Sequence, residues 1–204
     1  MTKLERKQAI VVGLTGQTGA GKTTVSQMFL ENTYYTINAD MVSRMVTAKD
    51  TPCLKEVVEH FGNDILDQDG NLIRKKLGDI VFCNRQELQA LEGITYPYIL
   101  QQIEKMIVSA TTFGADKILL DAPTLFESGA YSMCNKIVSV VSNKELRIRR
   151  IIARDGLTKS QAENRVKAQL SEEFFRTHSD YVIENNGTVD ELKLNTLSVI
   201  SKIR

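Results

Sequence analysis

This 204-residue sequence has little excess charge: 26 Lys and Arg face 25 Asp and Glu, which leaves a formal net charge of +1. Nucleic-acid-binding proteins commonly carry a strong basic excess, so the composition gives no reason to expect nucleic acid or an anionic membrane as a partner. The 42% hydrophobic and 25% charged content is that of an ordinary soluble globular protein.

Long apolar stretches are also missing. Residues 1–8 are polar, and the apolar run that follows, 9–12, is too short for a signal-peptide core or a transmembrane helix. There is no internal repeat, low-complexity tract or Pro/Gly/Ser linker. The length suits one α/β domain with insertions. We therefore expect a cytoplasmic protein with a single folded unit, no membrane contact and no signal for its oligomeric state.

Metal-binding and disulfide-forming residues are few. Cys53, Cys83 and Cys134 are odd in number and widely spaced, and the only histidines are His60 and His178. No zinc-binding spacing can be assembled from them. We expect reduced, mostly buried thiols.

Short apolar runs alternate with longer helical patterns, which is typical of an α/β fold with a parallel sheet and crossover helices. Their Ile, Leu and Val content suits strands covered on both faces. A helix is expected over 22–31, as the first helix after the first strand and its loop. The expected strands are 9–14, 34–37, 117–120, 136–141 and 181–183.

Two segments look inserted between these strands. Residues 40–109 are mostly helical, with turn-forming Gly, Asn and Asp at 62–71. Residues 143–178 read as a helical pair with a break near Gly156 and a cap at Thr158. The stretch 144–178 holds nine Lys or Arg against five Asp or Glu. It is either a solvated helix face or a lid over polyphosphate, and a phosphate loop elsewhere in the chain favours the lid.

That phosphate loop is Gly16-Gln17-Thr18-Gly19-Ala20-Gly21-Lys22-Thr23, which fits G-x-x-x-x-G-K-[ST] between an expected strand and helix. Glycines let backbone N–H groups approach phosphate oxygens, and the helix N-terminus adds a favourable dipole. Lys22 reaches the outer phosphates, and the Thr23 hydroxyl is a ligand for Mg²⁺.

Other phosphate-loop classes fit less well. A GTPase switch needs glycine where Thr124 stands, and the guanine-reading aspartate is replaced by Leu146. A motor or AAA-type ATPase needs a larger domain. A small-molecule kinase fits the length and the lid.

Two acidic residues follow expected strands, where ligands gather in open parallel sheets. Asp40 is either an acceptor-activating carboxylate or the N-cap of the next helix, and position alone favours the cap. Asp121 can orient the water shell of Mg²⁺ or the phosphate loop. Beyond it, Leu125 and Phe126 either hold the organic part of a substrate or fold back on the core.

The chain resembles the dephospho-CoA kinase family over nearly its whole length. The resemblance is carried by "GLTGQTGAGKTTVS", "NAD", "FGNDILDQDGNLIRKKLGDIVF", "LEGITYPYI", "DAPTLFESG", "RIIARDGLTKSQAENRVKAQ" and "SDYVIENNG". It implies a P-loop kinase that transfers the γ-phosphoryl group of ATP, with Mg²⁺, to the ribose 3′-hydroxyl of dephospho-CoA, the last step of coenzyme A biosynthesis. The implied parts are a core (8–40, 111–144 and 179–204), a helical CoA-binding insertion (41–110) and a lid (145–178).

The resemblance also assigns residues. It implies that Asp40 is the base or hydroxyl-orienting carboxylate, and that Arg154 is the lid arginine that reaches the phosphates alongside Lys22. Thr23 and Asp121 are the expected metal-site residues. Asn186 lies where such kinases hold adenine. The implied ATP loop comprises Gln17, Thr18, Gly19, Ala20, Gly21, Lys22, Thr23 and Thr24, and the implied acceptor residues are Asp40, Arg74, Leu125, Phe126 and Glu127.

Four positions depart from the family pattern. Asn38 stands where Asp is usual, Tyr96 replaces a histidine, Thr124 a leucine and Arg147 a glutamine. None of these changes removes a group needed for phosphoryl transfer. Two alternatives stay open: a P-loop kinase for a nucleoside or another small hydroxyl acceptor, and a non-catalytic ATP-binding regulator.

Overall fold

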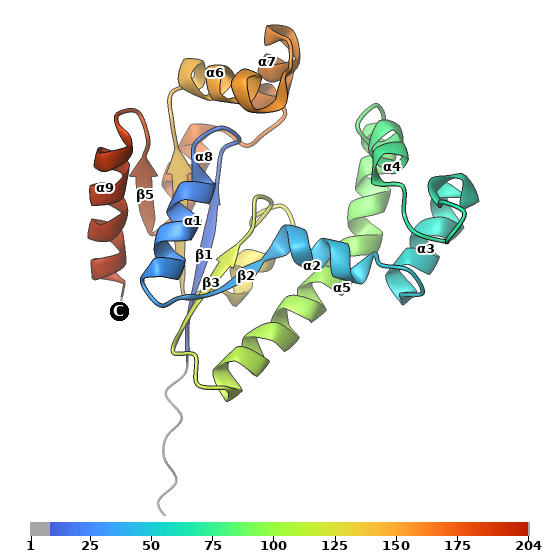
Figure 1. The fold of residues 1–204 in the computed structure, drawn as a ribbon, viewed down its shortest axis with the longest axis horizontal. Coiled ribbons are helices and arrows are strands. Elements are labelled where there is room, and N and C mark those ends of the chain that lie inside the picture. Colours follow the sequence, from blue (N-terminus) through green and yellow to red (C-terminus); the bar gives the residue numbers. More distant parts are fainter. Residues whose placement is uncertain (1–8, 204) are drawn as a thin grey trace, which may run out of the picture. The chain divides into compact units, whose positions relative to one another are not determined.

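The computed structural model describes residues 9–203, which form two compact units (Figure 1). The sheet unit consists of residues 9–37 and 109–203. The helical unit is Asn38–Val108. Each unit is described by itself.

Five strands make the sheet, in the order β2-β3-β1-β4-β5. The pairs β1–β3, β1–β4 and β4–β5 are parallel, with Leu14 opposite Asp121 in the first and opposite Val138 in the second. The expected α/β class is therefore confirmed, and the expected strands are right to within two residues at each end. The strands are β1 (Ile10–Gly16), β2 (Tyr35–Asn38), β3 (Lys117–Asp121), β4 (Lys136–Val141) and β5 (Tyr181–Glu184).

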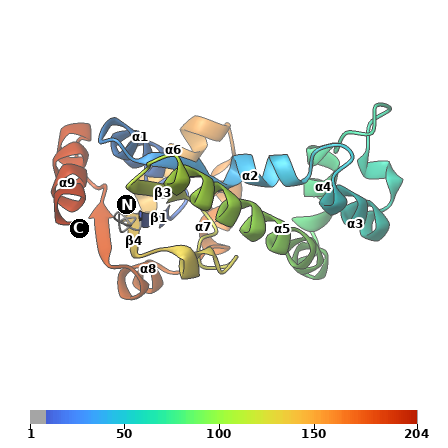
Figure 2. The same cartoon turned by 90° about the horizontal axis from the view of Figure 1, so that it is seen from below.

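Helices cover both faces of the sheet unit. Figure 2 shows α1 (Lys22–Glu31) on one side of the strands and α8 (Glu172–His178) on the other. The helix α9 (Val189–Lys202) packs beside α1 and β5, and a short 3₁₀ helix, η2 (Ala130–Met133), precedes β4. Fully buried Leu14, Phe29 and Val140 belong to the core cluster under α1. This packing fixes the carboxyl end of β1, where the phosphate loop begins.

The helical pair expected at 143–178 is in fact three helices, α6 (Lys144–Asp155), α7 (Lys159–Lys167) and α8. The break falls where it was expected. Gly156 ends α6 in the left-handed region (φ 66°), and Thr158 begins α7 with a reciprocal capping box to Gln161. Separate capping by Ser171, which accepts a hydrogen bond from the Phe174 amide, starts α8.

The helical unit is built from α2 (Ala39–Val46), α3 (Pro52–Phe61), the 3₁₀ helix η1 (Asn63–Ile65), α4 (Arg74–Val81) and α5 (Arg85–Thr112), which runs on into the sheet unit. Its core joins Val57, Ile65 and Leu77 to Leu91 and Tyr98 of α5. The expected turn region is confirmed, because Asp67 accepts hydrogen bonds from the amides of Asp69 and Asn71.

Among residues 9–203, no helix combines the length and the apolar character needed to cross a bilayer. All three cysteines are free, as expected. Cys53 is buried and Cys134 is partly buried, but Cys83 is exposed, so the expectation of mostly buried thiols is wrong for Cys83.

Candidate active site

The phosphate loop connects β1 to α1. Gly16 (φ 147°) and Gly21 (φ 100°) adopt backbone conformations that favour glycine, and a Cβ at Gly16 would collide with the Val140 carbonyl. Gly21 is the N-cap of α1, and no described side chain caps that helix. The amide groups of Lys22 and Thr23, at the start of the helix, therefore stay available for an anion, and the helix dipole favours one there.

Lys22, the first residue of α1, forms an ion pair with Asp121 at the carboxyl end of β3. Only 6% of the Asp121 side chain is exposed, against 18% for Lys22. The parallel register that sets Leu14 opposite Asp121 brings this carboxylate to the edge of the sheet where the loop starts. Asp121 thus holds the loop lysine, one of the two roles expected for it.

A metal ion would find few protein ligands here. Across the described residues, no three His, Cys, Asp or Glu side chains are grouped to hold a metal. Thr23 is exposed at the start of α1 and contributes a hydroxyl oxygen, while Asp121 contributes carboxylate oxygen. Thr23 and Asp121 are the residues that would hold a divalent metal, and Mg²⁺ is commonly bound through few protein ligands together with water and substrate phosphates.

Three side chains hold the outer side of the phosphate loop. Arg147 Nε donates to the Thr18 carbonyl at 3.0 Å, and Arg150 Nη1 donates to the Gly19 carbonyl at 3.3 Å. Asn185 Nδ2 donates to the Ala20 carbonyl at 2.7 Å. Three consecutive carbonyl groups are thereby fixed, which orients the peptide groups of the loop.

None of these loop-holding roles was found from the sequence. The phosphate-loop motif describes only the loop itself, and the sequence singled out Arg147 only as a departure from the family pattern. The one available signal was the position of Asn185, two residues after the last expected strand and beside Asn186.

Asn186, expected beside adenine, has its side chain engaged in this structure. Its Oδ1 accepts a hydrogen bond from the Asn143 amide at 2.7 Å, immediately before α6. That bond links the turn after β5 to the start of α6. Adenine contact by Asn186 stays a prediction.

Arg154 lies in the last turn of α6 and is paired with a carboxylate. Its Nε and Nη2 donate to the two oxygens of Asp155 at 2.8 and 3.0 Å, and Arg165 of α7 donates to Asp155 at 2.5 Å. The hydrogen bond to Asp155 raises the pKa of Arg154, and the same contact lowers the pKa of Asp155. With 60% of its side chain exposed, Arg154 remains accessible to a ligand.

The residues after β3 differ in burial: some belong to the core and others lie at the surface. Leu125 is fully buried, so it anchors the segment and has no surface to offer a substrate, which corrects its expected role. Phe126 is half-buried, edge-on to Phe174 of α8 at a centroid distance of 5.1 Å. Phe174 in turn stacks on His178 at 4.0 Å. Glu127 is exposed, and it and Phe126 stay predictions as acceptor contacts.

In the helical unit, Asp40 occupies the first turn of α2 and is exposed. The N-cap of that helix is Asn38, whose Oδ1 accepts a hydrogen bond from the Met41 amide at 3.0 Å. Position alone favoured Asp40 as the cap, and that interpretation is wrong. The carboxylate is left for other chemistry, and a negative charge in the first turn also suits the helix dipole.

Arg74 begins α4 and donates through Nη2 to the Thr47 hydroxyl at 2.9 Å. Burial and the nearby positive charge of Arg44 lower the pKa of Arg74. Among the described residues Arg74 forms no ion pair. A guanidinium beside a second cation suits an anionic ligand group.

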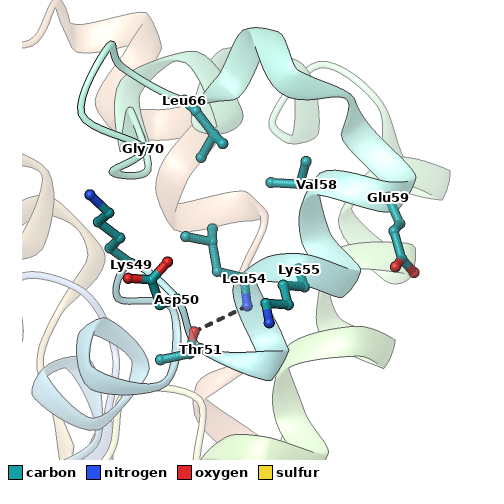
Figure 3. A pocket seen from close by; sticks show the side chains of 9 residues that line it. All are labelled: Lys49, Asp50, Thr51, Leu54, Lys55, Val58, Glu59, Leu66 and Gly70. Carbon is teal, nitrogen blue, oxygen red and sulfur yellow. Dashed lines mark hydrogen bonds between the residues drawn. The ribbon is translucent and has the colours of Figure 1, made fainter.

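A pocket of about 380 Å³ opens in the helical unit (Figure 3). Leu54, Val58 and Leu66 point toward one another across it, and the charged residues of its lining are Lys49, Lys55, Asp50 and Glu59. The apolar part of this lining suits the organic part of a ligand, and its charged side chains balance one another.

A parallel sheet with this loop between β1 and α1, and with its lysine held by a strand-end carboxylate, defines a P-loop nucleotide-dependent enzyme. The family model described as dephospho-CoA kinase matches residues 10–191. The chain belongs to the dephospho-CoA kinase family, whose members are kinases that transfer phosphate to a hydroxyl group.

Two relatives and one solved structure illustrate the match. Dephospho-CoA kinase from Carboxydothermus hydrogenoformans is 36% identical over 94% of this chain and 93% of its own length. The enzyme from Fusobacterium nucleatum is 38% identical over 90% of this chain and 93% of its own. A structure of dephospho-CoA kinase from Campylobacter jejuni matches with a TM-score of 0.70 at 27% identity, over 95% of this chain and 96% of that one. The family expected from the sequence is confirmed.

Proposed function

We propose that this chain transfers the γ-phosphoryl group of Mg·ATP to the ribose 3′-hydroxyl of dephospho-CoA, which completes coenzyme A. The observation that carries the proposal is the phosphate loop with Lys22 held by Asp121, in a chain that matches the family from residue 10 to residue 191. In phosphoryl transfer the protein contributes mainly alignment and charge neutralisation, for which such a loop is suited.

The proposed roles divide by location. In the sheet unit, the amides of the loop and Lys22 bind the β- and γ-phosphates, Thr23 and Asp121 serve the Mg²⁺ site, and Asn186 faces adenine. Arg154 would exchange Asp155 for the phosphate oxygens when the lid closes. Closure keeps water from taking the phosphoryl group.

In the helical unit, we assign Asp40 to the acceptor hydroxyl, because its carboxylate is exposed and the capping role belongs to Asn38. Arg74 would bind an anionic group of the acceptor. Phe126 and Glu127, from the sheet unit, complete the proposed set.

The test is ADP release by the purified chain with Mg·ATP, with and without dephospho-CoA, while CoA is followed by chromatography. We expect one CoA for each ADP. ADP release that a nucleoside or another small alcohol stimulates, but dephospho-CoA does not, would replace the acceptor and keep the kinase class. ATP binding with no acceptor-stimulated ADP release would favour a non-catalytic regulator.

A further inference from the structure

Arg147 carries a buried positive charge that lacks a carboxylate partner. Only 3% of the residue is exposed, and none of the ion pairs among the described residues includes it. Burial lowers the pKa of Arg147, and the charge of Glu172 opposes that effect. Glu172 is itself bound by Arg176 at 2.8 Å. Among the described residues Asp121 is the other buried charged residue, and it is paired with Lys22.

The guanidinium is held by neutral oxygens. Nε donates to the Thr18 carbonyl and Nη2 to Gln169 Oε1, both at 3.0 Å. The same Gln169 oxygen accepts a hydrogen bond from the Thr18 amide at 2.7 Å. Arg147 therefore binds the carbonyl group of Thr18, and Gln169 binds its amide group, so both polar groups of the Thr18 backbone are held.

A buried charge without a partner is costly, and isolated ones are rare in folded proteins. The cost falls when a ligand of opposite charge binds nearby. Here the nearby surface is the phosphate loop, whose amides and helix dipole also favour an anion. The Arg147 charge is thus placed where bound polyphosphate would balance it.

We propose that Arg147 is a positioning residue for the nucleotide, which fixes the phosphate loop through Thr18 and Gln169 and whose charge is balanced by the bound polyphosphate. This rests on the part of the proposed function that makes the loop a nucleotide site, and it does not depend on the acceptor.

The test separates the charge from the hydrogen bonds with two substitutions. Arg147→Gln removes the charge. Gln169→Glu keeps an oxygen for the Thr18 amide and for Arg147, but it places a carboxylate beside the guanidinium. The affinity for Mg·ATP is measured by titration calorimetry without acceptor, and Tm is measured without nucleotide. Arg149→Gln is the matched control, because it removes the same charge from an exposed position of the same helix.

We expect Arg147→Gln and Gln169→Glu each to weaken ATP binding about tenfold, the size given by one unit charge at roughly 10 Å and an effective dielectric constant of about 20. Gln169→Glu should raise Tm at the same time, because the buried cation gains a partner. Arg149→Gln should change affinity about twofold or less, because exposed charges are screened.

Wild-type affinity in Gln169→Glu would overturn the proposal, and that variant decides the matter if Arg147→Gln does not fold. Affinity that falls only together with Tm would also overturn it, because a structural role predicts that pattern. A wild-type chain that binds Mg·ATP but makes no CoA would sink the proposed acceptor and leave this test intact. A wild-type chain that does not bind Mg·ATP would sink both.

Discussion

At the scale of single residues, Asn38 caps α2, and Asp40 is the residue proposed to act on the acceptor hydroxyl. Asp40→Asn should lower kcat by roughly 10²-fold, the usual size of a lost general base, and lower Tm only slightly, because the cap is Asn38 and Asp40 contributes only its charge near the helix N-terminus. The measurements are steady-state kinetics and thermal unfolding. Asn38→Ala is the matched variant: it should lower the free energy of unfolding by about 1 kcal/mol, as for other lost N-caps. Unchanged kcat in Asp40→Asn would remove Asp40 from the reaction.

The cysteines differ in reactivity because they differ in environment. Burial, with a contribution from Glu56, raises the pKa of Cys53 to about 11, and burial raises the pKa of Cys134 to about 12. Since the thiolate is the reactive form, we expect iodoacetamide at pH 8 to modify exposed Cys83 first. Peptide mass spectrometry of the native protein measures the order. Equal labelling of all three sites without denaturant would contradict the burial of Cys53 and Cys134.

At the scale of elements, Asp180 joins the start of β5 to β4. It accepts hydrogen bonds from Lys136 Nζ at 2.9 Å and from the Ile137 amide at 2.8 Å. Burial acts to raise the pKa of Asp180, but these hydrogen bonds and the Lys136 charge outweigh it and lower the pKa below the ordinary 3.8.

This lowered pKa predicts a pH dependence of stability. A carboxyl group with a lowered folded-state pKa contributes stability above its unfolded pKa and loses it as the pH falls through the folded value. Asp180→Asn should therefore lower Tm at pH 7, and the difference from wild type should shrink below about pH 4. Thermal unfolding across this range measures it. Asp190→Asn, at an exposed acidic position in the first turn of α9, is the control. A Tm difference that stays constant down to pH 2 would contradict the assignment.

At the scale of the whole molecule, patterns local in sequence predicted local structure well. The strand–loop–helix unit around Lys22 and the turn at Gly156 and Thr158 follow from residue types that those conformations require. The apolar runs predicted the strands, because buried parallel strands need such runs.

Two kinds of feature could not be predicted from the sequence. One depends on contacts between segments far apart in the chain, and the other on which of two similar nearby residues takes a given role. Leu125 and Phe126 are both large and apolar, and only packing decides that the first is fully buried and the second lies half-exposed against α8. Asn38 and Asp40 are both good caps, and the observed first turn of α2 selects Asn38. The hydrogen bond from Arg147 to Thr18 joins residues that are 129 positions apart in the sequence, so no local pattern could predict it.

The three side chains that hold the phosphate loop bind its carbonyl groups, and every amino acid has a carbonyl. Thr18 of the loop should therefore tolerate substitution better than the residues whose side chains bind the loop. The partly exposed Thr18 can change its side chain and keep the backbone groups that are held. Arg150 and Asn185 cannot change so freely, because their side chains make the bonds. A scan of variants under selection for activity would find strict positions more than a hundred residues away from the motif that identifies the protein.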